Sequence, residues 1–406
     1  MDTKQSLDSL AIFGAAPAFT ELLHVGRPNI GDRARFTERM NDILDSKWLT
    51  NGGPYVQQFE RRIADLTQVK HCIAMCNATV ALEILIRALE CSGEVIVPSF
   101  TFVATANALQ WQGITPVFCD LDPRTHTLDP KRVEQLITPQ TTGIMGVHLW
   151  GHACDVEALT EIAGRRGLKL IFDSAHAFGC SYQGRMIGTF GDAEVFSFHA
   201  TKLINSLEGG AVVTNDDELA RKIRLMHNFG FTSFDQTSYI GINGKMNEVS
   251  AAMGLTNLES LDDFITVNRR NYELYARELA GLEGIALLPY PQVSKWHYQY
   301  VVLDIDESKT IVTRDELIDI LHRENVLARR YFYPGCHRME PYRSSFPDAG
   351  LRLPETERLA NRVLCLPTGT AVGERQIKFI SRILKLVLQD RVEIKRRLSA
   401  KRRDVG

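Results

Sequence analysis

A single lysine follows a run of residues that is expected to form a buried strand, and an aspartate ends the strand before it. Lys202 lies in FSFHATKLINSLEGGAVVTND (196–216), after the apolar run AEVFSF, while Asp173 closes the run LKLIFD. Lysine is almost never fully buried without a partner, so its position needs a chemical reason. Because ligands of open α/β sheets bind at the carboxyl ends of the strands, both side chains are candidates for one site.

Pyridoxal phosphate is a cofactor that uses both groups. A lysine amine holds its aldehyde as a Schiff base, and a carboxylate facing the ring nitrogen keeps the ring protonated as an electron sink. Its phosphate needs the free N–H groups of a helix N-terminus and small hydroxyl residues, which Ala78, Thr79 and Ser197 can supply. Phe102, after the run EVIVPS, can cover the ring face. Together these residues predict a pyridoxal phosphate site.

Each of these residues also has a purely structural interpretation. Asp173 could cap a helix, and Phe102 could belong to the core. Ser197 could be an ordinary strand-end hydroxyl, and Lys202 a surface lysine just beyond a strand. His176, three residues after Asp173, could be a buried structural histidine. The joint arrangement, in which an acid ends one strand and a lysine follows the next, favours the cofactor site.

The elements that must position these residues have the pattern of an α/β sheet. Between residues 70 and 215, short apolar runs recur: CIAMC, EVIVPS, PVFCDL, GIMGVHL, LKLIFD, AEVFSF and GGAVVTN. Such runs are typical of strands buried on both faces. Segments of helical period lie between several of them, as in 78–90 and 155–167, which predicts a mostly parallel sheet with crossover helices.

The pattern changes near residue 250. Two helical segments lead to an expected strand at 297–305, and Thr313 and Glu316 have the spacing of a capping box that opens a helix. ARRYFYP and VLCLP are expected to be further short strands. We therefore predict a large cofactor-binding α/β domain with an N-terminal arm over 1–260, and a smaller α+β domain over 261–406.

Composition argues against several other classes of protein. The 406 residues are 44% apolar and 24% charged, and a net charge of -2 gives no global attraction to nucleic acid or an anionic membrane. No secretory signal or membrane span is apparent. Eight scattered cysteines, several of them in apolar runs of a chain large enough not to need disulfides, favour a reducing cytoplasm as the location. Cys72 and Cys76 lack a second pair or a histidine set to complete a zinc site, so no metal is predicted. The basic segment RVEIKRRLSAKRRDVG is predicted to form a solvated helical tail.

Nine ordered segments resemble the sugar-nucleotide aminotransferases of the DegT/StrS type, which are fold-type I pyridoxal phosphate enzymes. The segments are WLTNGGPYVQQFE, CNATVAL, PSFTFVATANAL, PVFCDLDP, FDSAHAFG, FSFHATKLINSLEGGAVVTND, GINGKMNEVSAAMG, RRYFYPGCHRMEPY and CLPTGTAVG. The resemblance implies that Lys202 is the Schiff-base lysine and that Asp173 pairs with the pyridinium nitrogen. It also implies phosphate contacts from Ala78, Thr79 and Ser197.

The same resemblance assigns further residues. Phe102 matches the aromatic residue stacked on the ring, and His176 stands where the family more often has a glutamine beside the ring hydroxyl. An imidazole N–H can donate the same hydrogen bond. Asn243 matches an asparagine that reaches the phosphate of the neighbouring subunit, which implies a homodimer with a shared active site. The family's GYNYRM-like segment reads GINGKM here, so Gly244 and Lys245 replace its second tyrosine and its arginine.

Within that family, the segments VGRPN, WLTNGGP, CNAT, VHLWG, FSFHATK, HNFGF and YPGCHRMEPYR are most similar to the dTDP-4-amino-4,6-dideoxyglucose transaminases. This implies amination of dTDP-4-keto-6-deoxyglucose, with L-glutamate as donor and 2-oxoglutarate as product. Lys202 would move a proton as general base and acid. Tyr333 and His337 lie where the family approaches the sugar nucleotide, although both are equally interpretable as packing groups.

Several alternatives remain to be compared with this function. A pyridoxamine-dependent sugar dehydratase of the same fold commonly replaces the Schiff-base lysine by histidine, so Lys202 favours transamination. A 3-keto nucleotide-sugar aminotransferase differs only in its substrate. A non-catalytic, cofactor-binding regulator finds no support in a helix-turn-helix segment or a basic recognition face. A nicotinamide oxidoreductase needs a G-x-G-x-x-G turn, which CIAMCNATVAL does not contain.

Overall fold

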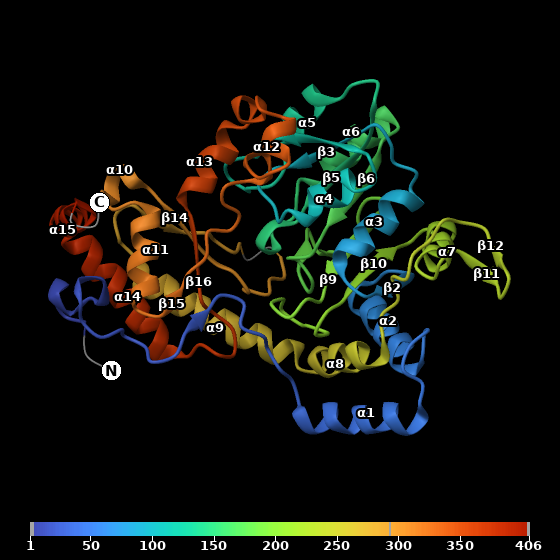
Figure 1. Cartoon of the computed structure of the whole chain (residues 1–406), viewed down its shortest axis with the longest axis horizontal. Coiled ribbons are helices and arrows are strands. Elements are labelled where there is room, and N and C mark those ends of the chain that lie inside the picture. The colour runs from blue at the N-terminus through green and yellow to red at the C-terminus, as the bar shows by residue number, and fades with distance from the viewer. Residues whose placement is uncertain (1–3, 292–293, 404–406) are drawn as a thin grey trace.

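The computed structural model describes residues 4–291 and 294–403. A large α/β body carries a seven-stranded sheet, and a smaller body built on a three-stranded sheet lies beside it (Figure 1). Within the described residues, no helix is both long and apolar enough to cross a lipid bilayer. The division of the chain at residue 260 stays a prediction, and Ser260 lies where one long helix passes into the next.

The large sheet contains all seven apolar runs as strands. They are β2 (His71–Met75), β3 (Glu94–Pro98), β4 (Thr115–Cys119), β5 (Thr141–Val147), β6 (Lys169–Asp173), β9 (Ala193–Ser197) and β10 (Gly210–Thr214). Their spatial order is β2-β10-β9-β6-β5-β3-β4. Only β10 is antiparallel to its neighbours, and the pairs from β9 to β4 are all parallel. The predicted mostly parallel α/β fold is therefore confirmed.

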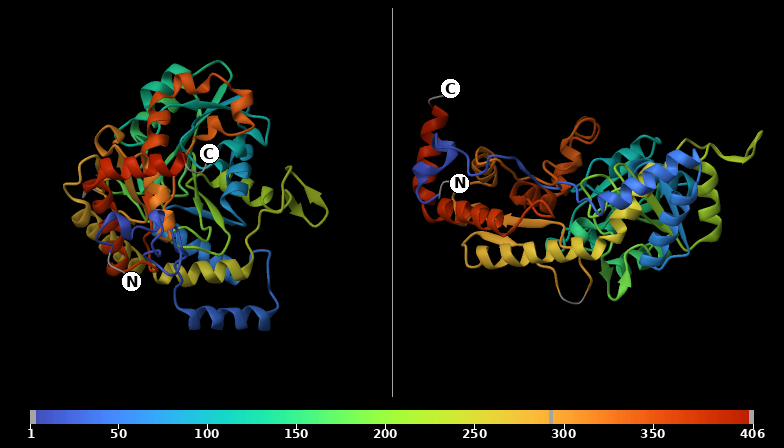
Figure 2. Two further views of the ribbon diagram at one scale, coloured as in Figure 1. Left: turned by 60° about the vertical axis from the view of Figure 1, so that its left-hand side comes forward. Right: turned by 90° about the horizontal axis from the view of Figure 1, so that it is seen from below.

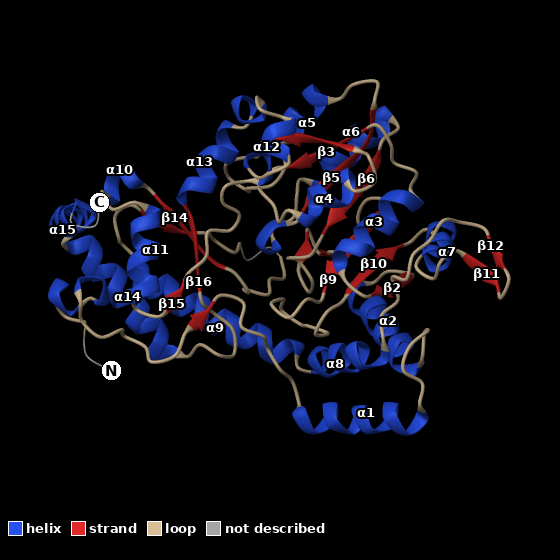
Figure 3. Ribbon diagram, viewed as in Figure 1, coloured by secondary structure: helices blue, strands red, loops and turns tan. Residues whose placement is uncertain are grey.

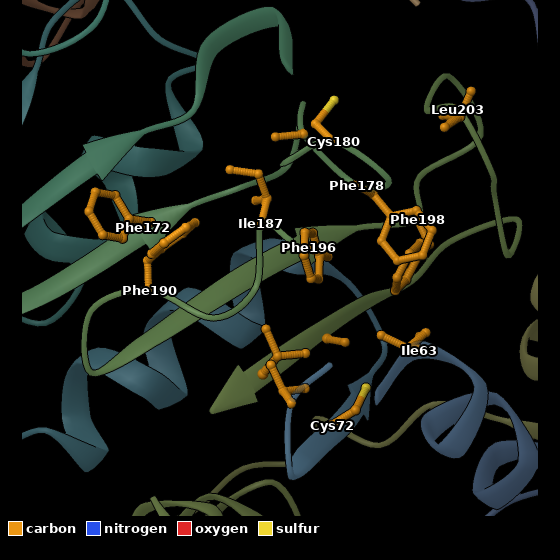
Figure 4. Close-up of a cluster of buried hydrophobic side chains, with 14 of the residues drawn as sticks. Ile63, Cys72, Phe172, Phe178, Cys180, Ile187, Phe190, Phe196, Phe198 and Leu203 are labelled. Carbon is orange, nitrogen blue, oxygen red and sulfur yellow. The ribbon is translucent and has the colours of Figure 1, made fainter. Parts of the chain in front are cut away.

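Helices cover both faces of this sheet (Figure 3). They are α2 (Pro54–Thr67), α3 (Ala78–Ala88), α4 (Ala104–Gln110), α5 (Pro130–Leu136), α6 (Val156–Arg166), α7 (Asp217–Met226) and α8 (Glu248–Glu259), with α1 (Arg33–Ser46) packed outside α8. Alternate strand residues face opposite ways, so the sheet contributes to two cores. Phe172 and Phe196 pack with Phe178 and Phe198 in the core beneath α2, α6 and α8 (Figure 4), while α3, α4 and α7 bury the other face.

The smaller body contains an antiparallel sheet flanked by helices. Its strands β13 (Ile285–Leu287), β14 (Val301–Ile305) and β16 (Val363–Leu366) pack with α9 (Leu261–Leu279), α11 (Arg314–Arg323) and α14 (Glu374–Gln389). Shorter helices are α10 (Glu307–Thr310), α12 (Tyr342–Ser345) and α13 (Pro354–Arg362), and the basic tail forms α15 (Arg391–Arg403). The capping box of Thr313 and Glu316 is present at the start of α11.

The prediction that ARRYFYP (328–334) forms a strand is wrong. The strand here is β15 (Val326–Leu327), and after it only Arg329 forms an isolated bridge, to Cys365. Residues 331–334 form a turn in which the N–H of Tyr333 donates to the carbonyl of Arg330 at 2.6 Å. The aromatic residues of the segment suit a strand, but Pro334 has no N–H to donate to a ladder.

The N-terminal arm packs against the smaller body. Leu7, Leu10, Ile12 and Phe19 lie in its hydrophobic core, and β1 (Leu23–His24) pairs in parallel with β15. Two other short pairs complete the fold: β7 (Ser181–Tyr182) with β8 (Arg185–Met186), and β11 (Phe231–Ser233) with β12 (Gln236–Thr237). The β11–β12 hairpin extends away from the large body (Figure 2).

Candidate active site

The neighbouring strands β6 and β9 end at one edge of the large sheet, and a cavity of about 570 Å³ opens there. Asp173 is the last residue of β6, Ser197 is the last of β9, and Lys202 lies in the turns that follow. Seven of the residues singled out from the sequence line the cavity: Ala78, Thr79, Phe102, Asp173, His176, Ser197 and Lys202. The order of the strands therefore brings together residues that are more than a hundred positions apart.

Lys202 has an amine with reduced basicity. Burial of its charge lowers the pKa to about 8, and the nearby Asp173 carboxylate acts in the opposite direction. Its amine has no hydrogen-bond or ion-pair partner among the residues described. A lysine with this pKa is neutral for a useful fraction of the time near neutral pH, and only the neutral amine can attack an aldehyde.

Asp173 is held rigidly at the end of its strand. The Thr105 hydroxyl donates to Oδ2 at 2.8 Å and the backbone N–H of Ala175 donates to Oδ1 at 3.1 Å. Burial raises the pKa of this carboxyl, whereas the two hydrogen bonds and the Lys202 charge lower it. A protonated ring nitrogen facing it would add a further positive charge and favour the ionised form. Thr105, in the first turn of α4, carries no sequence signal that predicts this contact.

The loop that follows Asp173 is fixed from beneath by a buried carboxylate. The Glu194 carboxylate accepts a hydrogen bond from the hydroxyl of Ser174, which directly follows Asp173. It also accepts hydrogen bonds from the backbone N–H groups of Gly188 and Phe190, at 2.7 and 2.8 Å. Burial raises the pKa of Glu194 to about 7. The carboxylate therefore ties the edge of the cavity to the turn before β9.

The N-terminus of α3 provides a cup for a phosphate group. Asn77 caps the helix by accepting the N–H of Val80 at 2.9 Å, which leaves the first backbone N–H groups, at Ala78 and Thr79, without intrahelical partners. A Cβ on Gly210 would lie 2.5 Å from the backbone nitrogen of Ala78, so only glycine lets β10 pass this closely. Ser197 pairs with Gly210 across the two strands and adds a hydroxyl. Backbone N–H groups and hydroxyls are the donors that a phosphate needs.

His176 is held between aromatic rings beside the lysine. Its ring stacks on Tyr300 at 4.5 Å and on Phe332 at 5.5 Å, between ring centroids. Burial lowers the pKa of His176 well below its usual value, with the Lys202 and His297 charges acting in the same direction, so the imidazole is neutral. Its buried Nδ1 has no hydrogen-bond partner within the described part of the chain. This nitrogen is free to bond a polar group of a ligand.

The donor set of the cavity fits pyridoxal phosphate. It offers an amine without a partner, a buried carboxylate fixed on both oxygens, a helix N-terminus and an unpaired imidazole nitrogen. Phe102 is 60% exposed and lies 6.5 Å from Phe332, so its face is open to a planar ring. Within the described residues, no group of three or more His, Cys, Asp or Glu side chains could hold a metal ion.

Three of the residues singled out from the sequence do not line the cavity. Asn243 is exposed and lies between the β11–β12 hairpin and α8. Tyr333 packs its ring against Arg314 and Arg330. His337 is buried, with Nδ1 2.6 Å from the Ser99 hydroxyl and Nε2 2.8 Å from Glu357. Both ring nitrogens of this histidine are engaged, which favours its interpretation as a packing group.

The chain is similar in sequence to known aminotransferases over most of its length. The profile of the DegT/DnrJ/EryC1/StrS aminotransferase family matches residues 31–385. The chain is 34% identical over 363 residues to the dTDP-4-amino-4,6-dideoxy-D-glucose transaminase of Escherichia coli, covering 89% of this chain and 97% of the relative. The transaminase of the same name from Shigella dysenteriae is 37% identical over 360 residues, with 88% and 97% covered. A GDP-perosamine synthase of Caulobacter vibrioides is 36% identical, with 86% and 94% covered.

Solved structures give the same result. DesI, crystallised in the presence of its TDP-sugar product, is 48% identical and superposes with a TM-score of 0.91, covering 98% of this chain and all of DesI (100%). Helicobacter pylori PseC, an aminotransferase involved in the biosynthesis of pseudoaminic acid, is 27% identical with a TM-score of 0.85, covering 91% of this chain and 100% of PseC.

Proposed function

This chain belongs to the DegT/DnrJ/EryC1/StrS aminotransferase family, and we propose that it converts dTDP-4-keto-6-deoxy-D-glucose to dTDP-4-amino-4,6-dideoxy-D-glucose with L-glutamate as amino donor. The enzyme is a nucleotide-sugar aminotransferase that depends on pyridoxal phosphate. The observation that carries the substrate is the 48% identity to DesI, a TDP-sugar enzyme, over 98% of this chain. The names of the relatives from Escherichia coli and Shigella dysenteriae support it.

The residues of the cavity have distinct tasks in this reaction. Bound pyridoxal phosphate supplies an electrophilic aldehyde and an electron-accepting ring. Lys202 would hold the cofactor, and its amine would move the proton at the α-carbon of glutamate, a role that suits an amine whose burial lowers its pKa to about 8 in the cofactor-free chain. Asp173 would keep the ring nitrogen protonated, and Thr105 and Ala175 hold its carboxylate in position. The N-terminus of α3 and Ser197 would bind the phosphate.

A direct assay tests this substrate. The purified chain is incubated with pyridoxal phosphate, L-glutamate and dTDP-4-keto-6-deoxyglucose, and mass spectrometry follows the amino sugar while a coupled assay follows 2-oxoglutarate. We expect both products in equal amounts. A 3-keto isomer and a GDP-linked keto sugar are run in parallel, the latter because of the 36% identity to a GDP-perosamine synthase. Faster turnover of either one, or no amino sugar from the dTDP substrate, would overturn the assignment.

The active unit proposed here is a homodimer in which Asn243 reaches the phosphate bound by the partner. Asn243 is exposed, and the β11–β12 hairpin and the segment between it and Asn243 carry exposed apolar side chains: Phe231 is 40% exposed, Phe234 101% and Ile240 76%. Apolar groups in this number on a projecting arm are typical of a surface that another protein covers.

The eight cysteines, all unpaired, are consistent with a reducing cytoplasm as the compartment.

Mixing two inactive variants tests the shared site. We expect light scattering to give twice the mass of one chain, and Asn243→Ala and Lys202→Ala each to lose activity as pure proteins. A mixed dimer of the two would contain one site with both Lys202 and the asparagine of the other chain, so activity should return when the variants are unfolded and refolded together. A monomeric wild type, or no recovery in verified mixed dimers, would contradict the shared site.

A further inference from the structure

We propose that Arg27 and Arg329 bind the diphosphate group of the nucleotide sugar, an assignment that rests on the proposed function. Both residues line the cavity that contains Lys202, and both are exposed. Neither guanidinium has an ion-pair or hydrogen-bond partner among the residues that the structure describes; that of Arg329 lies over the ring of Tyr331 at 5.3 Å. Two cations at the rim of a substrate cavity, without a structural partner, are available to bind an anion.

The β1–β15 pair brings these two arginines to the same rim. Leu23 pairs with Val326 and His24 with Leu327 in parallel, so the segments that follow both strands run in the same direction. Arg27 lies on one continuation and Arg329 on the other. Arg329 is fixed further by mutual backbone hydrogen bonds with Cys365 at 3.1 and 2.8 Å. Residues 302 positions apart in sequence thus line one cavity.

The segment that carries Arg27 is tied to the catalytic lysine. The side chain of Asn29 donates to the carbonyl of Leu203 at 3.1 Å, and its oxygen accepts the N–H of Thr370 at 3.1 Å. Leu203 directly follows Lys202, so the backbone near Arg27 has a defined place relative to the reacting amine. Such rigidity favours binding because little conformational entropy is lost when a ligand arrives.

The N-terminal arm is anchored upstream by a buried carboxylate. Glu324 accepts the backbone N–H groups of Ala11 and Ala18, both at 2.7 Å, and pairs with Lys4 at 3.0 Å. Helix α15 secures the same arm, because Arg397 pairs with Asp8 and the amine of Lys401 donates to the carbonyl of Ile12. The basic tail therefore serves to hold the arm that ends in β1.

The charges and the geometry of the cavity suit a diphosphate at this rim. Two acidic residues that could repel a diphosphate line the cavity. Asp173 is buried at the strand end, and the Glu208 carboxylate lies 3.6 Å from the ring nitrogen of His199. In the substrate, the diphosphate is attached at C1, across the sugar ring from the C4 keto group, which must approach the reacting centre beside Lys202. Arginine binds phosphate oxygens with two parallel N–H donors, so two arginines can engage two phosphates.

Nucleotide binding tests the assignment independently of turnover. We expect dTDP to bind the cofactor-loaded dimer about 10- to 100-fold more weakly in Arg27→Ala and in Arg329→Ala, measured by calorimetry, with Arg→Lys variants recovering part of the loss. Thymidine, which has no phosphate, should bind the variants and the wild type equally. The matched control is Arg330→Ala, because Arg330 pairs with Asp315 at 3.2 Å and does not line the cavity.

Kinetics distinguish a diphosphate from a carboxylate of the amino donor. The KM for the nucleotide sugar should rise in both variants, while the KM for glutamate and the rate of the first half-reaction stay unchanged. A rise in the KM for glutamate instead, or unchanged dTDP affinity in both variants, would overturn the diphosphate site. If the wild type binds dTDP through these arginines yet aminates no dTDP-linked keto sugar, the proposed function fails and the diphosphate site stands.

Discussion

Replacing Lys202 by alanine is expected to lower the rate of transamination by about 10⁴-fold or more. Positioned proton transfer alone contributes up to about 10⁴-fold, and the variant also loses the amine that holds the cofactor covalently. The chain should still fold, because the Lys202 amine makes no hydrogen bond within the described structure and its burial lowers the pKa to about 8, which destabilises the charged form. The rate of 2-oxoglutarate formation measures the effect.

Borohydride reduction identifies the attachment point directly. In the wild type, the reduced cofactor should remain on the peptide that contains residue 202. Lys202→Arg keeps a positive charge but has no amine that can form an imine, so it should be as inactive as the alanine variant. Lys222→Ala, which removes a half-buried lysine that pairs with Glu90 and does not line the cavity, serves as the control with full activity. Cofactor fixed by borohydride in the Lys202→Ala protein would show that another amine is used.

The same lysine gives the cofactor-free protein a defined pH dependence. Only the neutral amine reacts, so the rate of covalent attachment should rise with pH and level off above about 8, whereas an ordinary lysine would continue to gain reactivity toward about 10.4. Because the folded pKa is lowered, the unfolded chain binds more protons between these two values. The contribution of Lys202 to the free energy of unfolding therefore increases as pH rises through that window.

Local patterns in the sequence were sufficient to predict the large sheet and several residues that line the candidate site. Strands buried on both faces are apolar along their whole length, so the ends of β6 and β9 were readable as the positions of Asp173 and Ser197. Because neighbouring strands were expected to be parallel, both residues were expected at the same edge of the sheet. The same reasoning failed at residues 331–334, where Tyr333 and Phe332 resemble strand residues but lie in a turn.

The rim of the cavity could not be predicted in this way. β1 and β15 are two residues long, carry no periodic signal and come from opposite parts of the chain. Arg27 and Arg329 reach the same cavity because β1 pairs with β15, and the buried Glu324 helps to hold the N-terminal arm on the smaller body. Thr105 and Tyr300 likewise contact Asp173 and His176 through tertiary packing alone.

Asp173→Asn is expected to lower the rate of both half-reactions by on the order of 10³-fold while the cofactor stays bound. Asparagine has the same shape, and its oxygen can still accept a hydrogen bond from Thr105 or Ala175, so the fold of the strand end is kept. It carries no negative charge, however, and cannot keep a ring nitrogen protonated in a buried setting. Removing a preorganised electrostatic partner of a developing charge typically costs 10² to 10³-fold in rate.

Thr105→Val separates the charge of Asp173 from its orientation. This variant removes the 2.8 Å hydrogen bond to Oδ2 but leaves the carboxylate and the bond from Ala175 in place. A hydrogen bond to a charged group contributes about 1.5–3 kcal/mol, so the loss of rate should stay near ten- to 100-fold, below that of Asp173→Asn.

Single-turnover rates with glutamate provide the comparison, and the absorbance of the bound cofactor reports the protonation of its ring. If the rate of Asp173→Asn stayed within a few-fold of the wild type, the ring nitrogen would have another partner; if Thr105→Val matched it, orientation rather than charge would be the contribution of Asp173.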